Sequence, residues 1–303
     1  MNLKLDTKRL AALIADRLRL LAVELDPLDV ACAWPVFKAS SFGLPPMFVK
    51  VTSPEAARRT MDLLSTVGEL PFFPKPILAD PLAFDDLAVL CLEWKESVRV
   101  NAEDMTEGQL GSFLDGCRQL SAALQGFRGA VSEQEEAESP SEQFDALRRY
   151  ALRHRLSSML LRPLLSIPEP ERSYGARPLA IIHGDLQPKN YGFDGDRFAA
   201  VYDTDDLTRG LACEDACYAF TERMRRSELS AAARRRIIGL FLRLVAMSPW
   251  PRDEWVIAVS HARLRIAARR LDKHPDSAFV AMDIARRDRP LKALSAALKG
   301  EPC

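Results

Sequence analysis

The pattern of apolar residues changes near residue 95, and this change limits the folds open to the chain. Before it, apolar runs such as 47–52 and 87–92 are short and separated by turn residues, which is typical of strands. After it, apolar residues recur at helical spacing over long segments. Strands followed by long helices favour an α+β fold over a doubly wound sheet. We expect two lobes: a β-rich one over 1–95, with a leading helix, and a larger, mostly helical one over 96–303.

Individual elements follow from local signals. Ser53-Pro54-Glu55 has the N-cap residue, early proline and acid of a helix start, and this helix should run to about Val67. In the first lobe we also expect a helix over 7–24, a turn over 40–46, and strands over 31–39, 47–52, 74–79 and 87–92. In the second we expect helices over 106–127 and 144–165, an acidic connector over 133–141, strands over 179–182 and 198–202, and helices beyond 215 with breaks at 248–251, 273–275 and near Pro290.

Charge and composition argue against several classes of protein. The formal net charge is zero, so nothing global favours nucleic acid or a membrane surface as partner. No stretch approaches the ~20 apolar residues of a membrane span, and the start does not resemble a signal peptide. The six cysteines lack a framework spacing, so we expect reduced thiols and a cytoplasmic protein. Cys213 and Cys217 could share a metal on one helix face, but no partner pair is near and chance is the simpler explanation.

The clearest chemical pattern is His183-Gly184-Asp185-Leu186-Gln187-Pro188-Lys189-Asn190, followed by Asp203-Thr204-Asp205-Asp206. Phosphoryl transfer from ATP needs a carboxylate that orients the attacking hydroxyl and oxygen ligands that hold Mg²⁺ on the phosphates. Asp185 suits the first role, and Asn190 and Asp203 suit the second. Asp205 and Asp206 add negative charge that a metal would offset. The alternative is a polar hairpin loop, since Asp, Asn and Gly are ordinary turn residues, although the joint pattern is hard to obtain by chance.

Residues 179–220 resemble the catalytic core of the aminoglycoside phosphotransferase and choline kinase-like branch of the protein-kinase-like fold. The strand, the HGDLxPxN loop and the DxDD turn match, and 210–218 is similar to the family's G-x-P-x-x-D-L segment. The resemblance implies a two-lobed kinase fold that uses ATP and Mg²⁺. It also implies that Asp185 is the catalytic base, that Asn190 and Asp203, with Asp205 beside them, bind the metal, and that Asp215 anchors the catalytic loop from beneath.

The first lobe adds a possible phosphate contact. Lys50, on the predicted strand 47–52, resembles the strand lysine that contacts the α- and β-phosphates in kinases. Glu55 on the following helix is the candidate ion-pair partner, with Asp62 or Glu69 as substitutes. The alternative for Lys50 is a solvated lysine at a strand edge.

Two further features concern the nucleotide. The segment 92–95 resembles the kinase hinge, so Glu93 and Lys95 should border the adenine site. No G-x-G-x-x-G precedes Lys50, and Gly43 is the only glycine of that region. We therefore expect Ser41, with Ser40 and backbone amides, to cover the phosphates; the alternative is that phosphate coverage is weak.

The acceptor should be a hydroxyl of a small molecule. Gly184 replaces the arginine with which protein kinases read a phosphorylated activation loop, and the span from Asp203 to Asp215 is too short for such a loop. From Arg223 onward the chain has 18 Lys and Arg against 8 Asp and Glu. Because arginine grips phosphate and carboxylate, an anionic or lipopolysaccharide-type sugar is one hypothesis, with Arg223, Arg225 and Arg226 nearest the motif. The alternative is that these arginines form solvated helix faces.

Two other functions stay open at this point. The missing glycine-rich loop suits a kinase-like binding protein that is weak or inactive in turnover. An atypical protein Ser/Thr kinase of the same branch is the second alternative.

Overall fold

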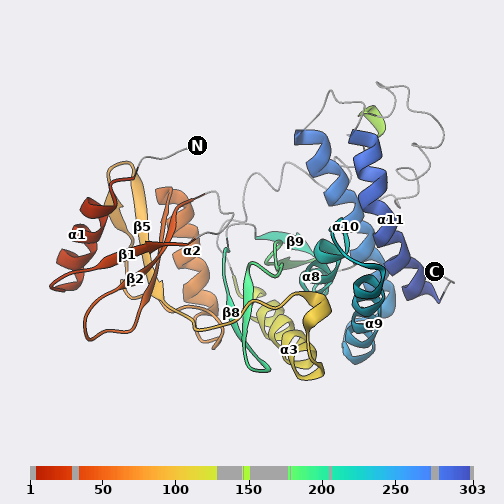
Figure 1. Ribbon diagram of the computed structural model, residues 1–303, viewed down its shortest axis with the longest axis horizontal. Helices are drawn as coiled ribbons and strands as arrows, with labels where there is room; N and C mark the ends of the chain where they lie inside the picture. Colours follow the sequence, from red (N-terminus) through yellow and green to blue (C-terminus); the bar gives the residue numbers. More distant parts are fainter. Residues whose placement is uncertain are drawn as a thin grey trace.

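A five-stranded antiparallel sheet forms the first part of the computed structural model (Figure 1). The structure describes residues 5–28, 34–127, 145, 147–150, 177, 179–204, 207–273 and 280–300. The strands stand in the order β1-β2-β3-β5-β4, with bounds Glu24–Pro27 (β1), Val36–Ser40 (β2), Met47–Thr52 (β3), Leu82–Phe84 (β4) and Leu87–Glu93 (β5).

Two helices cover the two faces of this sheet. Successive side chains of a strand point to opposite faces. Val49 and Cys91 accordingly pack with Leu10 of α1 (Thr7–Leu18), whereas Leu90 packs with Leu63 of α2 (Pro54–Val67). The helix start at Ser53 is confirmed, because the Ser53 side chain accepts the Ala56 N–H at 3.1 Å and α2 ends at Val67.

Three expectations for this part were wrong. The first helix ends at Leu18 rather than near residue 24, because Arg19 turns into a left-handed conformation and caps it. The chain then forms β1, which sequence patterns had not indicated. Segment 74–79 is no strand but makes a single bridge from Pro76 to Leu92, since prolines at 74 and 76 lack the N–H groups of a ladder. The strand expected over 31–39 is described only from residue 34, and β2 begins at Val36.

The second part is mostly helical, and the α+β class is confirmed. Helix α3 is followed by two small antiparallel pairs, β6 with β9 and β7 with β8. The bounds are Glu107–Leu124 (α3), Ala180–Ile182 (β6), Tyr191–Asp194 (β7), Arg197–Val201 (β8), Thr208–Gly210 (β9), Glu214–Met224 (α8), Ala231–Met247 (α9), Arg252–Lys273 (α10) and Val280–Lys299 (α11), with a 3-10 turn at Ala102–Asp104.

The helix breaks were predicted in part. The break at 248–251 is confirmed, because α9 ends at Met247 and α10 begins at Arg252. Pro290 does not end a helix, as was expected, but lies inside α11. Tertiary packing outweighs the lost backbone hydrogen bond, since Leu291, Leu294 and Leu298 of this helix are buried in the core. The connector over 133–141 and most of the helix expected over 144–165 lie outside the described residues.

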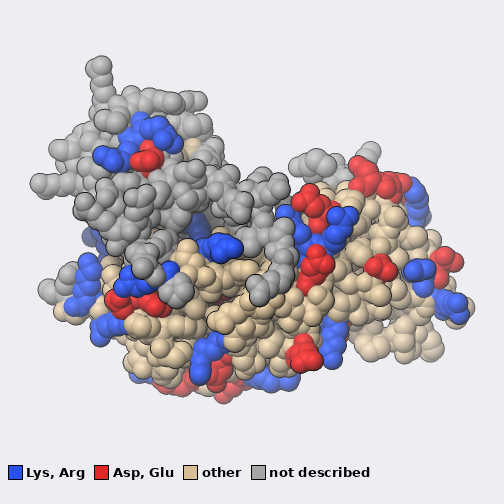
Figure 2. All heavy atoms as spheres, turned by 180° about the vertical axis from the view of Figure 1, so that it is seen from behind, with Lys and Arg blue, Asp and Glu red and all other residues tan. Residues whose placement is uncertain are grey.

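One apolar cluster extends from α2 through α3 to α8, α9, α10 and α11. The division of the chain into two lobes at residue 95 therefore stays a prediction. No helix in the described part of the chain is long and apolar enough to cross a membrane. On the face shown in Figure 2, the described basic and acidic side chains are interspersed.

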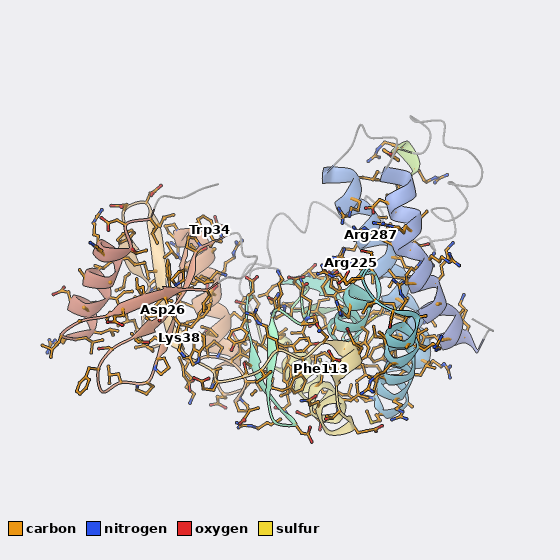
Figure 3. All side chains as sticks on the ribbon, viewed as in Figure 1. Asp26, Trp34, Lys38, Phe113, Arg225 and Arg287 are labelled. Atoms are coloured by element: carbon orange, nitrogen blue, oxygen red, sulfur yellow. The ribbon has the colours of Figure 1, made fainter. Side chains whose placement is uncertain are left out.

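Aromatic packing joins the β7–β8 hairpin to α3. The Phe113 ring of α3 (Figure 3) lies 5.2 Å from the Tyr191 ring and 5.6 Å from the Phe198 ring, measured between centroids. Gly116, one turn further along α3, faces Phe198 so closely that a Cβ would overlap the ring. Because β7 follows Asn190 directly and β8 leads toward Asp203, this packing places both ends of the chemical motif.

We predict opposite effects for two glycine substitutions on α3. Gly116→Ala should lower the free energy of unfolding by about 1–3 kcal/mol, because the core cannot take the extra methyl group. Gly111→Ala is the matched control: it has open space around its Cβ position and should stabilise by up to about 1 kcal/mol. Chemical denaturation measures both, and equal effects would contradict the packing described.

Candidate active site

Asp215 holds the turn at His183 and Gly184 from beneath. Its carboxylate oxygens accept the N–H of His183 at 2.8 Å and the N–H of Gly184 at 2.9 Å. Burial raises the pKa of Asp215, while His183 and the two amide donors favour its ionised form. Gly184 has a φ of +80°, a conformation that glycine adopts without strain. The first turn of α8 thus fixes the backbone that leads into Asp185.

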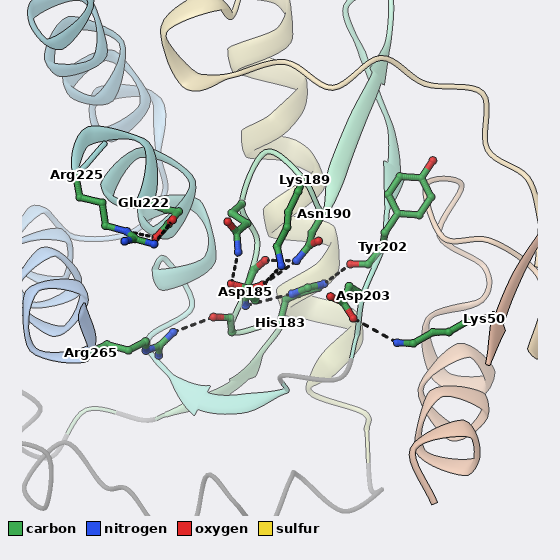
Figure 4. A network of polar contacts seen from close by, with 12 residues as sticks. Lys50, His183, Asp185, Lys189, Asn190, Tyr202, Asp203, Glu222, Arg225 and Arg265 are labelled. Atoms are coloured by element: carbon green, nitrogen blue, oxygen red, sulfur yellow. Dashed lines mark hydrogen bonds and ion pairs between the residues drawn. The ribbon is translucent and has the colours of Figure 1, made fainter. Parts of the chain in front are cut away.

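Asp215 binds N–H groups of this turn, and Arg265 of α10 binds a carbonyl group of the same turn (Figure 4). The guanidinium donates to the Gly184 carbonyl at 2.8 Å. Glu214 lies beside it, 3.8 Å from Arg265 and 3.1 Å from Nδ1 of His261. Burial alone would raise the pKa of Glu214, but His261 and Arg265 lower it below its usual value. A buried charge network therefore supports the turn.

The Asp185 carboxylate is held by the loop that it belongs to. Asp185 is only 3% exposed. Its Oδ1 accepts from Gln187 at 2.7 Å, its Oδ2 accepts from the Asn190 amide at 2.9 Å, and the Lys189 ammonium lies 3.4 Å from Oδ2. Asn190 also donates to the Asp185 carbonyl at 2.8 Å. Both contacts of Asn190 use its amide nitrogen, so its amide oxygen is left for another ligand.

Asp203 connects this loop to the sheet. Its Oδ1 lies 3.3 Å from Nζ of Lys50 on β3, and Lys50 is buried at 7% exposure. Asp203 has a φ of +56°, which aspartate tolerates better than most residues. Just before it, the Tyr202 carbonyl lies 3.0 Å from Nε2 of His183. Through this contact His183 joins the loop to the end of β8.

A cavity of about 450 Å³ lies between the sheet and this loop. Lys50, Lys189, Asn190 and Asp203 line it together, with apolar and aromatic walls from Leu28, Val36, Phe48, Trp94, Val98 and Tyr202. Such a site offers flat apolar surface for a ring, together with cations and hard oxygen ligands for a metal-bound phosphate group.

The model of the phosphotransferase enzyme family matches residues 45–255, more than two thirds of the chain. The chain belongs to this family. The prediction of a phosphotransferase is therefore confirmed. No curated protein matches the chain in sequence.

Solved structures of related folds agree. An amicoumacin kinase in complex with AMP-PNP, Ca²⁺ and Ami is 16% identical, with a TM-score of 0.58 over 97% of this chain and 96% of that one. An aminoglycoside phosphotransferase from Alicyclobacillus acidocaldarius is 15% identical, with a TM-score of 0.60 over 92% of each chain. A macrolide 2'-phosphotransferase from Brachybacterium faecium is 15% identical, with a TM-score of 0.55 over 98% and 99%. The likeness confirms the predicted two-lobed kinase-like fold.

The structure of this phosphotransferase does not bring Glu55 to Lys50. Glu55 lies in the first turn of α2, pairs with Arg59 at 3.6 Å, and its side chain is 73% exposed. The substitutes Asp62 and Glu69 are exposed as well. The cause is the sheet-facing side of α2, which is taken by apolar residues. Among the described carboxylates, Asp203 is the one that pairs with Lys50.

Ser41 is also far from the predicted phosphate end. In the β2–β3 hairpin, Lys50 pairs with Val36, whereas Ser41 follows the opposite end of β2, in the turn after the Ala39–Met47 pair. At ~3.3 Å per strand residue, roughly 15 Å separate the two ends. Leu28 and Val36, which flank the β1–β2 connection, line the cavity instead.

The hinge residues divide between two environments. Lys95 lines the cavity, and its carbonyl accepts the Tyr202 hydroxyl at 3.0 Å. The Glu93 carboxylate lies 3.0 Å from Nζ of Lys95 and accepts the Lys75 N–H at 3.4 Å. Lys95 thus lines the cavity, whereas Glu93 is engaged with Lys95 and Lys75 at the end of β5.

Other metal-ligand candidates gain no support. Asp205 lies outside the described residues. Cys213 and Cys217 are buried, and burial raises the pKa of both thiols. No group of three or more His, Cys, Asp and Glu able to hold a metal occurs in the part of the chain that the structure describes.

The arginines nearest the motif are engaged in ion pairs. Arg223 donates from Nε to both oxygens of Glu103, at 2.7 and 2.9 Å. Arg225 and Arg226 share the buried Glu222 carboxylate. These three arginines are therefore bound to carboxylates of the fold itself.

Sequence patterns missed several residues around the site. Lys189 and Gln187 contact Asp185 within the motif, and the short spacing could have indicated them. Arg265 and Tyr202 could not have been found, because their partners are backbone carbonyls 81 and 107 positions away.

We predict that Asp215→Asn loosens the catalytic loop. The amide nitrogen of Asn would face a backbone N–H, and a buried donor without an acceptor costs about 1–3 kcal/mol. Asp115→Asn, at an exposed surface pair with Arg118, is the control and should change stability by less than about 0.5 kcal/mol. Denaturant unfolding compares them, and equal stabilities would show that Asp215 is no anchor.

Proposed function

We propose that this protein transfers the γ-phosphate of ATP, with Mg²⁺, to a hydroxyl of a small molecule. The observation that carries the proposal is the convergence of Lys50, Asn190 and Asp203 on one cavity, with Asp185 hydrogen-bonded to Asn190 beside it. These residue types are the ones that phosphoryl transfer requires.

Asp185 is the proposed general base. Its carboxylate accepts the proton of the acceptor hydroxyl as the hydroxyl oxygen bonds to the γ-phosphorus and the bond from that phosphorus to the ADP oxygen breaks. Gln187 and Asn190 restrict the carboxylate to one orientation. Lys189, which contacts Asp185 and lines the cavity, is placed to offset charge on the transferred group.

The metal would be held by the Asn190 amide oxygen and the Asp203 carboxylate. Both are hard ligands at the polar end of the cavity, so the residues present fit Mg²⁺. Bound there, the ion supplies positive charge that binds and orients the phosphates. Lys50 would contact the phosphates, and the apolar walls with Trp94 and Tyr202 would hold the adenine.

A small acceptor is supported by the short connection from Asp203 to Asp215, which already contains β9 and the start of α8. Structures similar to this chain include an aminoglycoside phosphotransferase with ADP and hygromycin B and a macrolide 2'-phosphotransferase. For this chain we retain an anionic sugar as the acceptor class, although Arg223, Arg225 and Arg226 are engaged by carboxylates. An atypical protein Ser/Thr kinase would reveal itself by autophosphorylation with radiolabelled ATP.

We predict that Asp185→Asn lowers turnover by about 10²–10⁴-fold, because the general base is lost. Mg·ATP should still stabilise the variant against heat, since the nucleotide ligands are unchanged. Asp194→Asn, an exposed residue of the neighbouring hairpin paired with Arg197, is the control and should keep full activity. A screen of acceptor hydroxyls for ADP release measures turnover, and an active Asp185→Asn variant would refute the assigned base.

We predict that Mg·ATP at a hundredfold excess over its Kd stabilises the protein by about 2.7 kcal/mol. Lys50→Met should remove most of this effect, and chelation of Mg²⁺ should reduce it. Lys8→Met is the charge-matched control, because Lys8 is an exposed lysine of α1 that does not line the cavity. Thermal unfolding provides the readout. Absence of any nucleotide effect on the wild type would favour the non-catalytic binding protein.

A further inference from the structure

A basic pocket of about 540 Å³ lies among α8, α9 and α11. Six of its eleven described lining residues are arginines and none is acidic. Figure 3 shows Arg225, which follows α8, beside Arg287 of α11. The six, which we call the arginine pocket, are Arg225, Arg234, Arg235, Arg286, Arg287 and Arg289.

The described carboxylates that pair with arginines of the pocket are shared with further arginines. Glu222 serves two guanidinium groups and Asp283 serves three. A carboxylate carries a single negative charge, so a carboxylate shared by several guanidinium groups leaves positive charge uncompensated. The neighbouring positive charges that remain repel one another. The five arginines concerned are Arg225 and Arg226 at Glu222, and Arg270, Arg286 and Arg287 at Asp283.

Two further arginines raise this excess. Arg235 and Arg289 are exposed lining residues, and no ion pair joins either one to another residue in the described ranges. This positive charge also affects Arg270 beside the pocket. The pKa of Arg270 is lowered, first by burial and then by the charges of Arg287 and Arg225. A ligand with negative charge would relieve this repulsion.

We propose that the arginine pocket binds a small molecule carrying phosphate or carboxylate groups. Guanidinium groups bind both anions through paired hydrogen bonds, and the volume lies in the range of small-molecule sites. Solvated helix faces are the competing explanation, but they point outward from single helices. Here arginines of α9 and α11 and the end of α8 converge on one hollow.

The arginine pocket is separate from the position where a hydroxyl would meet Asp185. Arg225 follows Asp215 by ten residues, and at ~1.5 Å per helical residue the pocket lies roughly 15 Å along α8 from the catalytic loop. The anionic group therefore belongs either to the remote end of a long acceptor or to a separate molecule. The first source rests on the proposed function, and the second does not.

Calorimetric titration with pyrophosphate and with citrate, without nucleotide, tests the proposal. Lys50→Met serves as background, because it weakens anion binding in the nucleotide cavity. Removing Arg235 and Arg289 deprives no described carboxylate of its partner, so we expect R235Q/R289Q to fold and to raise the Kd about tenfold or more. R17Q/R236Q, two exposed arginines outside the pocket, is the charge-matched control and should bind like the background. No binding in the background protein, or equal Kd values in the two doubles, would overturn the proposal.

A kinetic arm with Lys50 intact distinguishes the two sources. If the acceptor fills the pocket, R235Q/R289Q raises KM for anionic acceptors and leaves KM for uncharged ones unchanged. If a separate anion binds, no acceptor KM changes while the calorimetric Kd still rises. Because the titration needs no turnover, its failure is distinguishable from a failure of the proposed function.

Discussion

The candidate site depends on one buried carboxylate, that of Asp215, which accepts two consecutive backbone N–H groups of the catalytic loop. A carboxylate is costly to bury, and it stays ionised only where donors and positive charge surround it. The helix that carries it is held by the apolar core, where Phe220 of α8 packs against Phe241 of α9 with 5.6 Å between ring centroids. The large helical part is therefore the frame that fixes the Asp185 backbone.

A second constraint spans the two parts of the chain. The Lys50–Asp203 pair joins β3 to the end of the β7–β8 hairpin, and both residues line the same cavity. In the proposed function each partner would exchange this contact for a ligand, Lys50 for phosphate and Asp203 for the metal. Without ligands, the pair keeps two binding groups of opposite charge in place and spares each one the cost of a buried charge without a partner. Replacement of either Lys50 or Asp203 should therefore weaken nucleotide binding.

The features that could be predicted from the sequence are those determined by residues close together along the chain. Asp185 and Asn190 are five positions apart, so their contact is local, and β3 and α2 follow from alternation and capping within their own residues. Ser41 does not lie near Lys50, because the turn of a hairpin is far from the residues at its open end. Glu55 does not pair with Lys50, because the orientation of α2 depends on which of its residues pack on the sheet. Short strands such as β9 are set by remote partners, and no local signal announces them.

The arginines show the same limit in electrostatics. Arg223, Arg225 and Arg226 lie nearest the motif in sequence, yet carboxylates of the fold bind all three, and of the three Arg225 alone lines the arginine pocket. Arg235 and Arg289 are 54 positions apart and line one pocket without an ion pair to any described residue. What decides whether an arginine can serve a ligand is the number of guanidinium groups that share each nearby carboxylate, and this ratio exists only in the folded chain. A search for ligands of this enzyme should therefore vary negative charge, on acceptors and on separate small molecules, as well as the hydroxyl presented to Asp185.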